Sequence, residues 1–344
     1  MEESVNPTSY VMLAGFVASV GTILFLFQRH IRGIPLISYE LRFRVPWGPG
    51  VGMLALFVPM ITILSVFIGP AVPREEPTIV EQHTINVEQN IDESNPTSFV
   101  TKTLGTSVVL IGFVLALAMC LHFFVGAGPR DLGLPTNGKQ LLSDMGLGFV
   151  AWLASLLPIF ALQYLLTIAL EPETEHPLID ELQLSHTPAM MLVGVVMVVF
   201  AAPLFEEFVF RVILQGWLEK WEDESIGFAG SARPAAPPIP DAEEATDDIA
   251  EEAEVLPFPI DSTPVPLPRT GVLRDCPHGW LPILLSGFLF GLAHLGNGVS
   301  PVPLVLFGIV LGYLYQRPHR LAPSITAHAL FNGFSMLMLW LSLK

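Results

Sequence analysis

Two adjacent carboxylates and a guanidinium interrupt one apolar stretch of the sequence near its centre. Residues 205–211 read Phe-Glu-Glu-Phe-Val-Phe-Arg, inside an apolar run over residues 188–217. Glu207 and Arg211 are four residues apart, so they share a helical face in the order that favours pairing. Glu206 points about 100° away on a helix, and its neighbour one turn further on is a phenylalanine. The spacing predicts a Glu207–Arg211 ion pair and leaves Glu206 as a carboxylate without a helical partner.

Histidines occupy two later apolar runs. Residues 290–294 read Phe-Gly-Leu-Ala-His, so His294 follows small residues that permit close helix approach. His328 and Asn332 are four residues apart and share a face, which predicts two donors aimed the same way. Taken singly, each of these sites is also consistent with an ion pair or hydrogen bond that only fixes helix packing.

Taken together, the carboxylates, histidines and asparagine contain the parts of amide hydrolysis. A base is needed to deprotonate water, and donors are needed for the developing oxyanion. Other intramembrane protease motifs are missing from the sequence, including His-Glu-x-x-His, Gly-x-Ser-Gly and Gly-x-Gly-Asp. The remaining histidines lie in loops or near the ends of apolar runs and are interpreted as non-catalytic: His30, His83, His122, His176, His186, His278 and His319.

The composition indicates a membrane protein. Of the 344 residues, 51% are hydrophobic and 14% are charged, against about 25% charged in a soluble domain. This hydrophobicity also excludes a wholly disordered chain. The net charge of −16 argues against a nucleic-acid partner. Two cysteines, Cys120 and Cys276, are too few for a disulfide scaffold or a cysteine-rich zinc site.

The apolar runs predict an all-α, polytopic transmembrane bundle of about eight spans, since a span needs about 20 apolar residues. The first run is a permanent span rather than a signal peptide, because residues 1–9 contain no Lys or Arg. The sixth and seventh runs are short. The predicted spans are 10–27, 51–68, 104–125, 145–170, 188–217, 280–295, 301–315 and 321–343.

Basic and acidic loops alternate along the chain, which predicts the orientation of the bundle. Arg29, Arg32, Arg42 and Arg44 follow the first span, whereas the loops after the second and fourth spans are acidic. Both chain ends are therefore expected to face outward. The loops expected in the cytoplasm are 28–50, 126–144, 218–279 and 316–321.

One segment differs from the rest of the chain. Residues 222–276 contain 13 acids and 3 bases, and nine prolines lie within residues 231–270. Acidic, proline-rich sequence buries too little apolar surface to offset chain entropy, so a disordered insert is predicted, with docking of a basic partner as the alternative. The predicted organisation is a two-span region with an acidic loop, 1–103, and a protease core, 104–221 and 277–344, around the insert.

The three polar motifs, in this order, resemble those of the CPBP family. That family comprises type II CAAX prenyl proteases, Abi proteins and bacteriocin-processing or immunity proteins. Three further segments also resemble the family: residues 130–134 (Arg-Asp-Leu-Gly-Leu), 311–315 (Leu-Gly-Tyr-Leu-Tyr) and 321–325 (Leu-Ala-Pro-Ser-Ile). The resemblance covers about 128–344 without the insert. The insert is unusual for the family, and residues 1–100 match none of its features.

The resemblance implies roles for the motif residues. Glu206 and His294 would bind and activate the attacking water, while His328 and Asn332 would form the oxyanion hole. Glu207 and Arg211 are assigned from their spacing as a supporting pair. The family is often described as metalloproteases, and Glu206, His294 and His328 are the residues that could hold Zn²⁺. A glutamate-activated water without a metal fits the same residues, and it is the mechanism we favour.

The resulting hypothesis is an intramembrane endopeptidase that cleaves a membrane-associated peptide or protein, in CAAX-type or leader-peptide processing. It would reside in the lipid bilayer, in the cytoplasmic (inner) membrane if the source is bacterial, and would bind no nucleic acid. One alternative is a non-catalytic bacteriocin-immunity or scaffold protein of the same fold. The other is an ion-coupled transporter, because intramembrane ionisable residues also mark ion pathways. Transport is disfavoured by the lack of a visible internal repeat.

Overall fold

Every regular element in the described part of the chain is a helix, and the described residues contain no strand. The computed structural model describes residues 7–40, 45–57, 60–61, 96–170, 187–226, 279–296 and 298–343. Its helices are α1 (Pro7–Ile31), α2 (Pro49–Leu54), α5 (Pro96–Val125), α6 (Gly138–Leu170), α8 (Pro188–Val195), η1 (Val196–Ala201), α9 (Ala202–Glu207), η2 (Phe208–Gln215), α10 (Gly216–Ile226), α11 (Trp280–Leu292), α12 (Pro301–Gln316) and α13 (Leu321–Ser342).

Five of the described helices are long and apolar enough to cross a membrane, so the chain is an integral multi-pass membrane protein. Two shorter apolar helices, Trp280–Leu292 and Pro301–Gln316, match the runs predicted to be short. Of the predicted span at 51–68, residues 51–57 and 60–61 are described, and α2 ends within it at Leu54; the other half lies outside the described residues. The five long helices are Thr8–Ile31, Thr97–Val125, Gly138–Leu170, Pro188–Ser225 and Leu321–Ser342.

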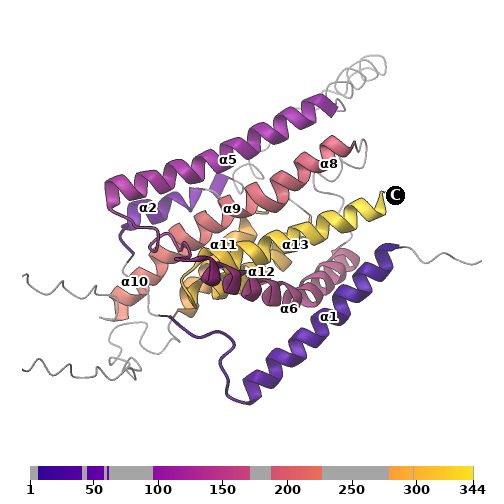
Figure 1. Ribbon diagram of the computed structural model, residues 1–344, viewed down its shortest axis with the longest axis horizontal. Helices are drawn as coiled ribbons and strands as arrows, with labels where there is room; N and C mark the ends of the chain where they lie inside the picture. The colour runs from indigo at the N-terminus through magenta and orange to yellow at the C-terminus, as the bar shows by residue number, and fades with distance from the viewer. Residues whose placement is uncertain are drawn as a thin grey trace, which may run out of the picture.

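The elements from α8 to α10 follow one another without a break (Figure 1). The Thr187 side chain accepts a hydrogen bond from the Met190 N–H, and Pro188 occupies the first turn, two features that start a helix. Two π-helical segments, η1 and η2, flank α9. Such segments shift the register of the backbone hydrogen bonds and often occur at functional sites.

Glycines allow the helices around the centre to pack closely. A β-carbon on Gly287 of α11 would lie 2.7 Å from the backbone nitrogen of Ile309 in α12. A β-carbon on Gly148 of α6 would lie 2.5 Å from the carbonyl oxygen of Pro323 in α13. Both distances are too short for a side chain, so α11 meets α12 and α6 meets α13 backbone to backbone. This confirms the close helix approach predicted from the small residues in the sixth run.

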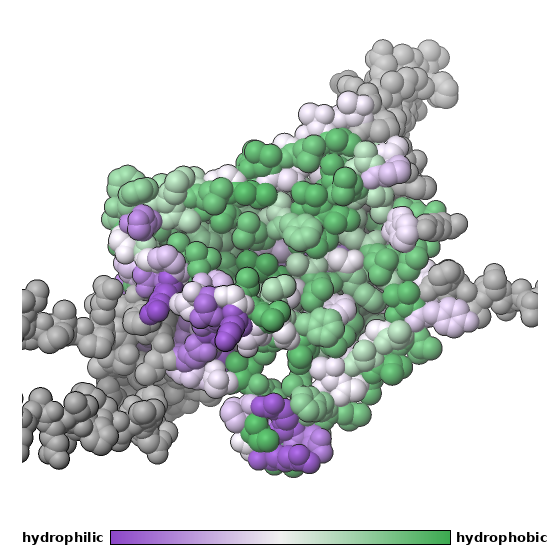
Figure 2. Space-filling model, in the orientation of Figure 1, coloured by the Kyte–Doolittle hydropathy of each residue, from purple (hydrophilic) through white to green (hydrophobic). Residues whose placement is uncertain are grey.

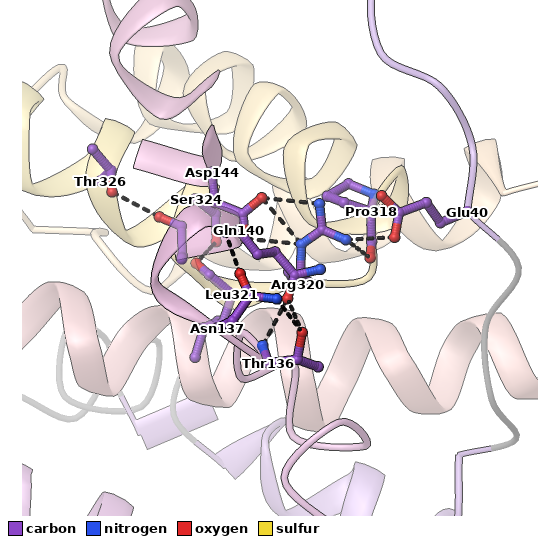
Figure 3. Close-up of polar contacts among 11 residues, drawn as sticks. Glu40, Thr136, Asn137, Gln140, Asp144, Pro318, Arg320, Leu321, Ser324 and Thr326 are labelled. Carbon is purple, nitrogen blue, oxygen red and sulfur yellow. Dashed lines mark hydrogen bonds and ion pairs between the residues drawn. The ribbon is translucent and has the colours of Figure 1, made fainter. Parts of the chain in front are cut away.

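The loops predicted to share the cytoplasmic side meet at one end of the bundle. The Glu40 N–H donates to the Arg317 carbonyl at 2.8 Å, and the Leu321 N–H donates to the Gly133 carbonyl at 2.8 Å. Arg320 also contacts Glu40, as Figure 3 shows. Hydrophilic side chains gather at the lower left in Figure 2, while the visible flank over α5, α8 and α13 is apolar. The first and last described helices begin and end, respectively, at the opposite end (Figure 1).

The predicted start of the insert at residue 222 was wrong. Helix α10 continues to Ile226. Within it, Glu222 is buried and its Oε2 accepts a hydrogen bond from the Gly279 N–H at 2.8 Å. Glu222, which was predicted to belong to a solvated insert, therefore links the chain before the insert to the chain after it. The remainder of the predicted insert lies outside the described residues.

Candidate active site

Two neighbouring glutamates lie at the centre of the longest described apolar helix, Pro188–Ser225. They end α9, the short segment between the two π-helical stretches. Glu207 is fully buried, whereas the Glu206 side chain is 20% exposed. The helical rotation between adjacent residues thus gives the two carboxylates different environments.

Glu207 is the centre of a buried polar network. Its Oε2 accepts a hydrogen bond from Arg211 Nε at 3.0 Å, the ion pair predicted from the spacing. Its Oε1 accepts from His328 Nδ1, also at 3.0 Å. Arg211 Nη1 donates to Ser286 Oγ at 2.8 Å, and that hydroxyl donates to the Phe210 carbonyl at 3.0 Å. The network therefore joins η2, α11 and α13 and compensates the charge of Glu207.

Glu206 faces two imidazole rings. Its Oε2 lies 3.9 Å from His294 Nε2 and 3.7 Å from His328 Nε2. These separations exceed a hydrogen bond, and the buried Oε2 atom has no hydrogen-bond partner among the described residues. The His294 side chain is 23% exposed. Glu206 in α9, His294 in the turn after α11 and His328 in α13 therefore converge on the more open side of the buried network.

A backbone contact of His294 shows which of its two ring nitrogens carries the proton. Its Nδ1 lies 2.8 Å from the Phe290 carbonyl oxygen, which can only accept. Nδ1 therefore bears the proton, and in the neutral ring Nε2 presents a lone pair. An ionised Glu206 and this lone pair are both acceptors, so a molecule with two O–H donors, such as water, satisfies both.

Aromatic rings hold the imidazole of His328. The rings of Phe290 and Phe307 meet it edge to face, with centroid distances of 5.5 Å and 5.8 Å. The guanidinium carbon of Arg211 lies 5.2 Å from the centre of the Phe290 ring. Phe290 belongs to the second sequence motif, whereas no pattern in the sequence pointed to Phe307 or Ser286. Phe307 is an apolar residue in an apolar run, and Ser286 is a single hydroxyl in one.

Asn332 and His328 share a face of α13, as predicted. Their hydrogen bonds, however, point in different directions, whereas two donors aimed the same way were expected. Asn332 Nδ2 donates to the backbone carbonyl of Val198 in η1 at 2.8 Å, whereas His328 Nδ1 faces Glu207. An amide nitrogen has two N–H bonds, so one Asn332 donor remains.

A metal centre needs several His, Cys, Asp or Glu side chains close together. Among His, Cys, Asp and Glu of the described ranges, no three are grouped so that they could hold a metal ion. Glu206, His294 and His328, the residues that sequence reasoning named for zinc, thus do not form a ready ligand set here.

Comparison with known families decides the class of protein. Residues 267–334 match the family described as type II CAAX prenyl endopeptidase Rce1-like. The chain contains an Rce1-like CAAX endopeptidase domain. It is accordingly a membrane protease, and proteases of this family act on protein or peptide substrates.

The matched segment contains part of the site. It includes His294, His328 and Asn332, while Glu206 and the Glu207–Arg211 pair precede it. The hydrogen bonds and ion-pair distances to Glu206 and Glu207 link these earlier residues to the matched part of the chain. Comparison with curated proteins and with solved structures gave no match.

Proposed function

We propose that this Rce1-like protease hydrolyses a peptide bond of a membrane-associated peptide or protein, with a water activated by Glu206 and His294. The reaction belongs to CAAX-type or leader-peptide processing. The observation that supports this most strongly is the unpartnered Oε2 of Glu206, 3.9 Å and 3.7 Å from two imidazole nitrogens. An unsatisfied acceptor inside a protein is costly, and a water molecule that donates to Glu206 and to His294 removes that cost.

The chemistry follows from these positions. Glu206 accepts a proton as the water oxygen attacks the scissile carbonyl carbon, and the carbonyl oxygen becomes an oxyanion. The remaining Asn332 N–H and the Nε2–H of a His328 ring protonated on both nitrogens are the proposed donors to that oxyanion. When the C–N bond breaks, the proton taken up by Glu206 passes to the leaving nitrogen. Glu207 orients His328 through the hydrogen bond to Nδ1, and Arg211 balances its charge.

The test is replacement of Glu206 by Gln, which preserves shape but removes the base. We expect turnover to fall by about 10²–10⁴-fold, the usual contribution of a general base, with thermal stability unchanged. Cleavage of a membrane-anchored peptide library in proteoliposomes, read by mass spectrometry, measures this. Glu224→Gln on the exposed end of α10 is the matched control. A folded Glu206→Gln protein that retains full activity would contradict the proposal.

The metal question has its own experiment. Under the proposed mechanism, turnover of the purified protein is unchanged after exhaustive chelation and dialysis. Loss of turnover that added Zn²⁺ restores would instead assign a metal to Glu206, His294 and His328. The measurement uses the same peptide library, with a known zinc protease as a positive control for chelation.

We further propose that the complete bundle contains eight spans, with residues 51–68 as the second and a disordered insert after residue 226. The acidic, proline-rich composition supports the insert. Replacing residues 227–276 by a short Gly/Ser linker should leave membrane insertion and thermal stability intact. Loss of either would show that the segment is structural.

A further inference from the structure

A proline creates a gap in the backbone hydrogen bonds next to Glu206. In the π-helical register of η1, the Ala202 N–H donates to the Met197 carbonyl, five residues earlier. The same register would pair residue 203 with the carbonyl of Val198. Residue 203 is proline and has no N–H to donate.

A side chain from another helix fills this gap. Asn332 Nδ2 in α13 donates to the Val198 carbonyl at 2.8 Å. A carbonyl without a donor is expensive in the interior of a membrane protein, where water is scarce. The two helices are neighbours here, since a β-carbon on Gly333 would meet the Val199 side chain at 3.8 Å, an ordinary van der Waals distance.

We infer that Asn332, besides offering its remaining N–H to the oxyanion, has a positioning role: its other N–H replaces the hydrogen bond missing at Pro203. Glu206 lies three residues after Pro203, and His328 lies one turn before Asn332. The bridge from Asn332 to Val198 therefore joins the two helical segments just beside the Glu206–His328 contact. It keeps the carboxylate at its 3.7 Å distance from the ring. The effect on activity rests on the proposed function, whereas the effect on stability does not.

A double-mutant cycle tests the bridge. Asn332→Leu removes the donor at similar size, and Pro203→Ala restores the backbone N–H that can pair with Val198. Asn332→Leu alone should lower the melting temperature by about 3–8 °C, because a buried carbonyl is left unpaired. In the Pro203→Ala background the same substitution should lower it by less than half as much. Pro158→Ala in α6 is the matched control: it restores an N–H elsewhere in a span and should leave the cost of Asn332→Leu unchanged.

Kinetics separate positioning from a purely structural role. At a temperature where all variants are folded, Asn332→Leu should reduce kcat by roughly 10- to 100-fold with little change in KM, as expected for a small misplacement of reacting groups. Pro203→Ala should restore part of that loss, since it relieves the same gap.

Two outcomes would overturn the inference. An equal drop in melting temperature in both backgrounds would show that Asn332 does not compensate Pro203. An unrelieved loss of kcat in a thermally rescued double variant would show that the bridge from Asn332 to Val198 does not position Glu206. The first outcome is independent of the Glu206→Gln test, because melting temperature can be measured in an inactive protein, whereas the second rests on the proposed function.

Discussion

Two arginines of this protein each bind carboxylates, one inside the membrane-spanning region and one at the end of the bundle. Arg211 is fully buried and binds Glu207 and Ser286. The Arg320 side chain is 14% exposed, binds Asp144 through two nitrogens, and reaches the half-exposed Glu40 (Figure 3). Similar chemical groups therefore occur in two different environments.

Burial determines what each cluster does. Removing water from a charge is costly, so the Arg211 cluster is stable only while every partner remains. That requirement also fixes His328 beside Glu206, through its hydrogen bond to Glu207. The Arg320 cluster instead joins Asp144 of α6 and the segment that contains Glu40 to the start of α13, where water can replace a lost partner on one side. The buried charges thus fix the position of the site residues, whereas the end cluster stabilises the packing of the helices around them.

The largest effect on stability should come from breaking the buried cluster. Arg211→Met leaves Glu207 as an uncompensated charge and should cost about 3–5 kcal/mol. Thermal or denaturant unfolding in detergent measures the change. The double variant Arg211→Met with Glu207→Gln removes both charges and should recover part of the loss. If the single and double variants are equally destabilised, charge compensation is not what the pair provides.

A smaller loss is expected for the buried acid of the end cluster. Asp144→Asn keeps the shape of the side chain but removes the charge that Arg320 binds, and should cost about 1.5–3 kcal/mol, the range for hydrogen bonds to charged groups. Unfolding under the same conditions gives the comparison. Peptide cleavage should persist in the folded fraction, because Asp144 is not part of the Glu206 site. A loss of kcat as large as that of Glu206→Gln would remove the distinction between the two clusters.

The exposed acid of the end cluster should matter least. The Glu40 side chain is 50% exposed, and exposed ion pairs contribute about 0–1 kcal/mol. Glu40→Gln should therefore change the free energy of unfolding by no more than this, and added salt should reduce the difference further. A cost that equals that of Asp144→Asn would show that Glu40 is as strongly coupled to Arg320 as the buried acid.

The stabilisation that Arg320 contributes to the end cluster is expected not to change with pH near neutrality. Burial would lower the pKa of Arg320, but the hydrogen bonds and charges of Asp144 and Glu40 raise it above its usual value. A raised pKa means that this stabilisation is complete below the ordinary arginine value and is lost only when the pH rises through the higher one. Unfolding free energies of wild type and Arg320→Gln should therefore differ by a constant amount between about pH 7 and pH 9.

Much of the fold could be predicted from local sequence. Hydropathy and run length identified the long helices, because a span of about 20 apolar residues is a local property. The Glu207–Arg211 ion pair followed from an i,i+4 spacing on one helix. The start of the insert was misplaced, since charge in α10 resembles charge in a solvated segment until a partner such as the Gly279 N–H is known.

The sequence by itself determined which residues could do chemistry and on which helical faces they stand. Only the tertiary structure decided which of them meet. The Glu207–His328 and Asn332–Val198 contacts join positions 121 and 134 residues apart, and Arg211–Ser286 joins positions 75 apart. Such contacts depend on how each helix is rotated and packed against the next, which glycines such as Gly148 and Gly287 permit. Periodicity along one helix gives a side chain its direction, but its partner comes from the packing of another helix.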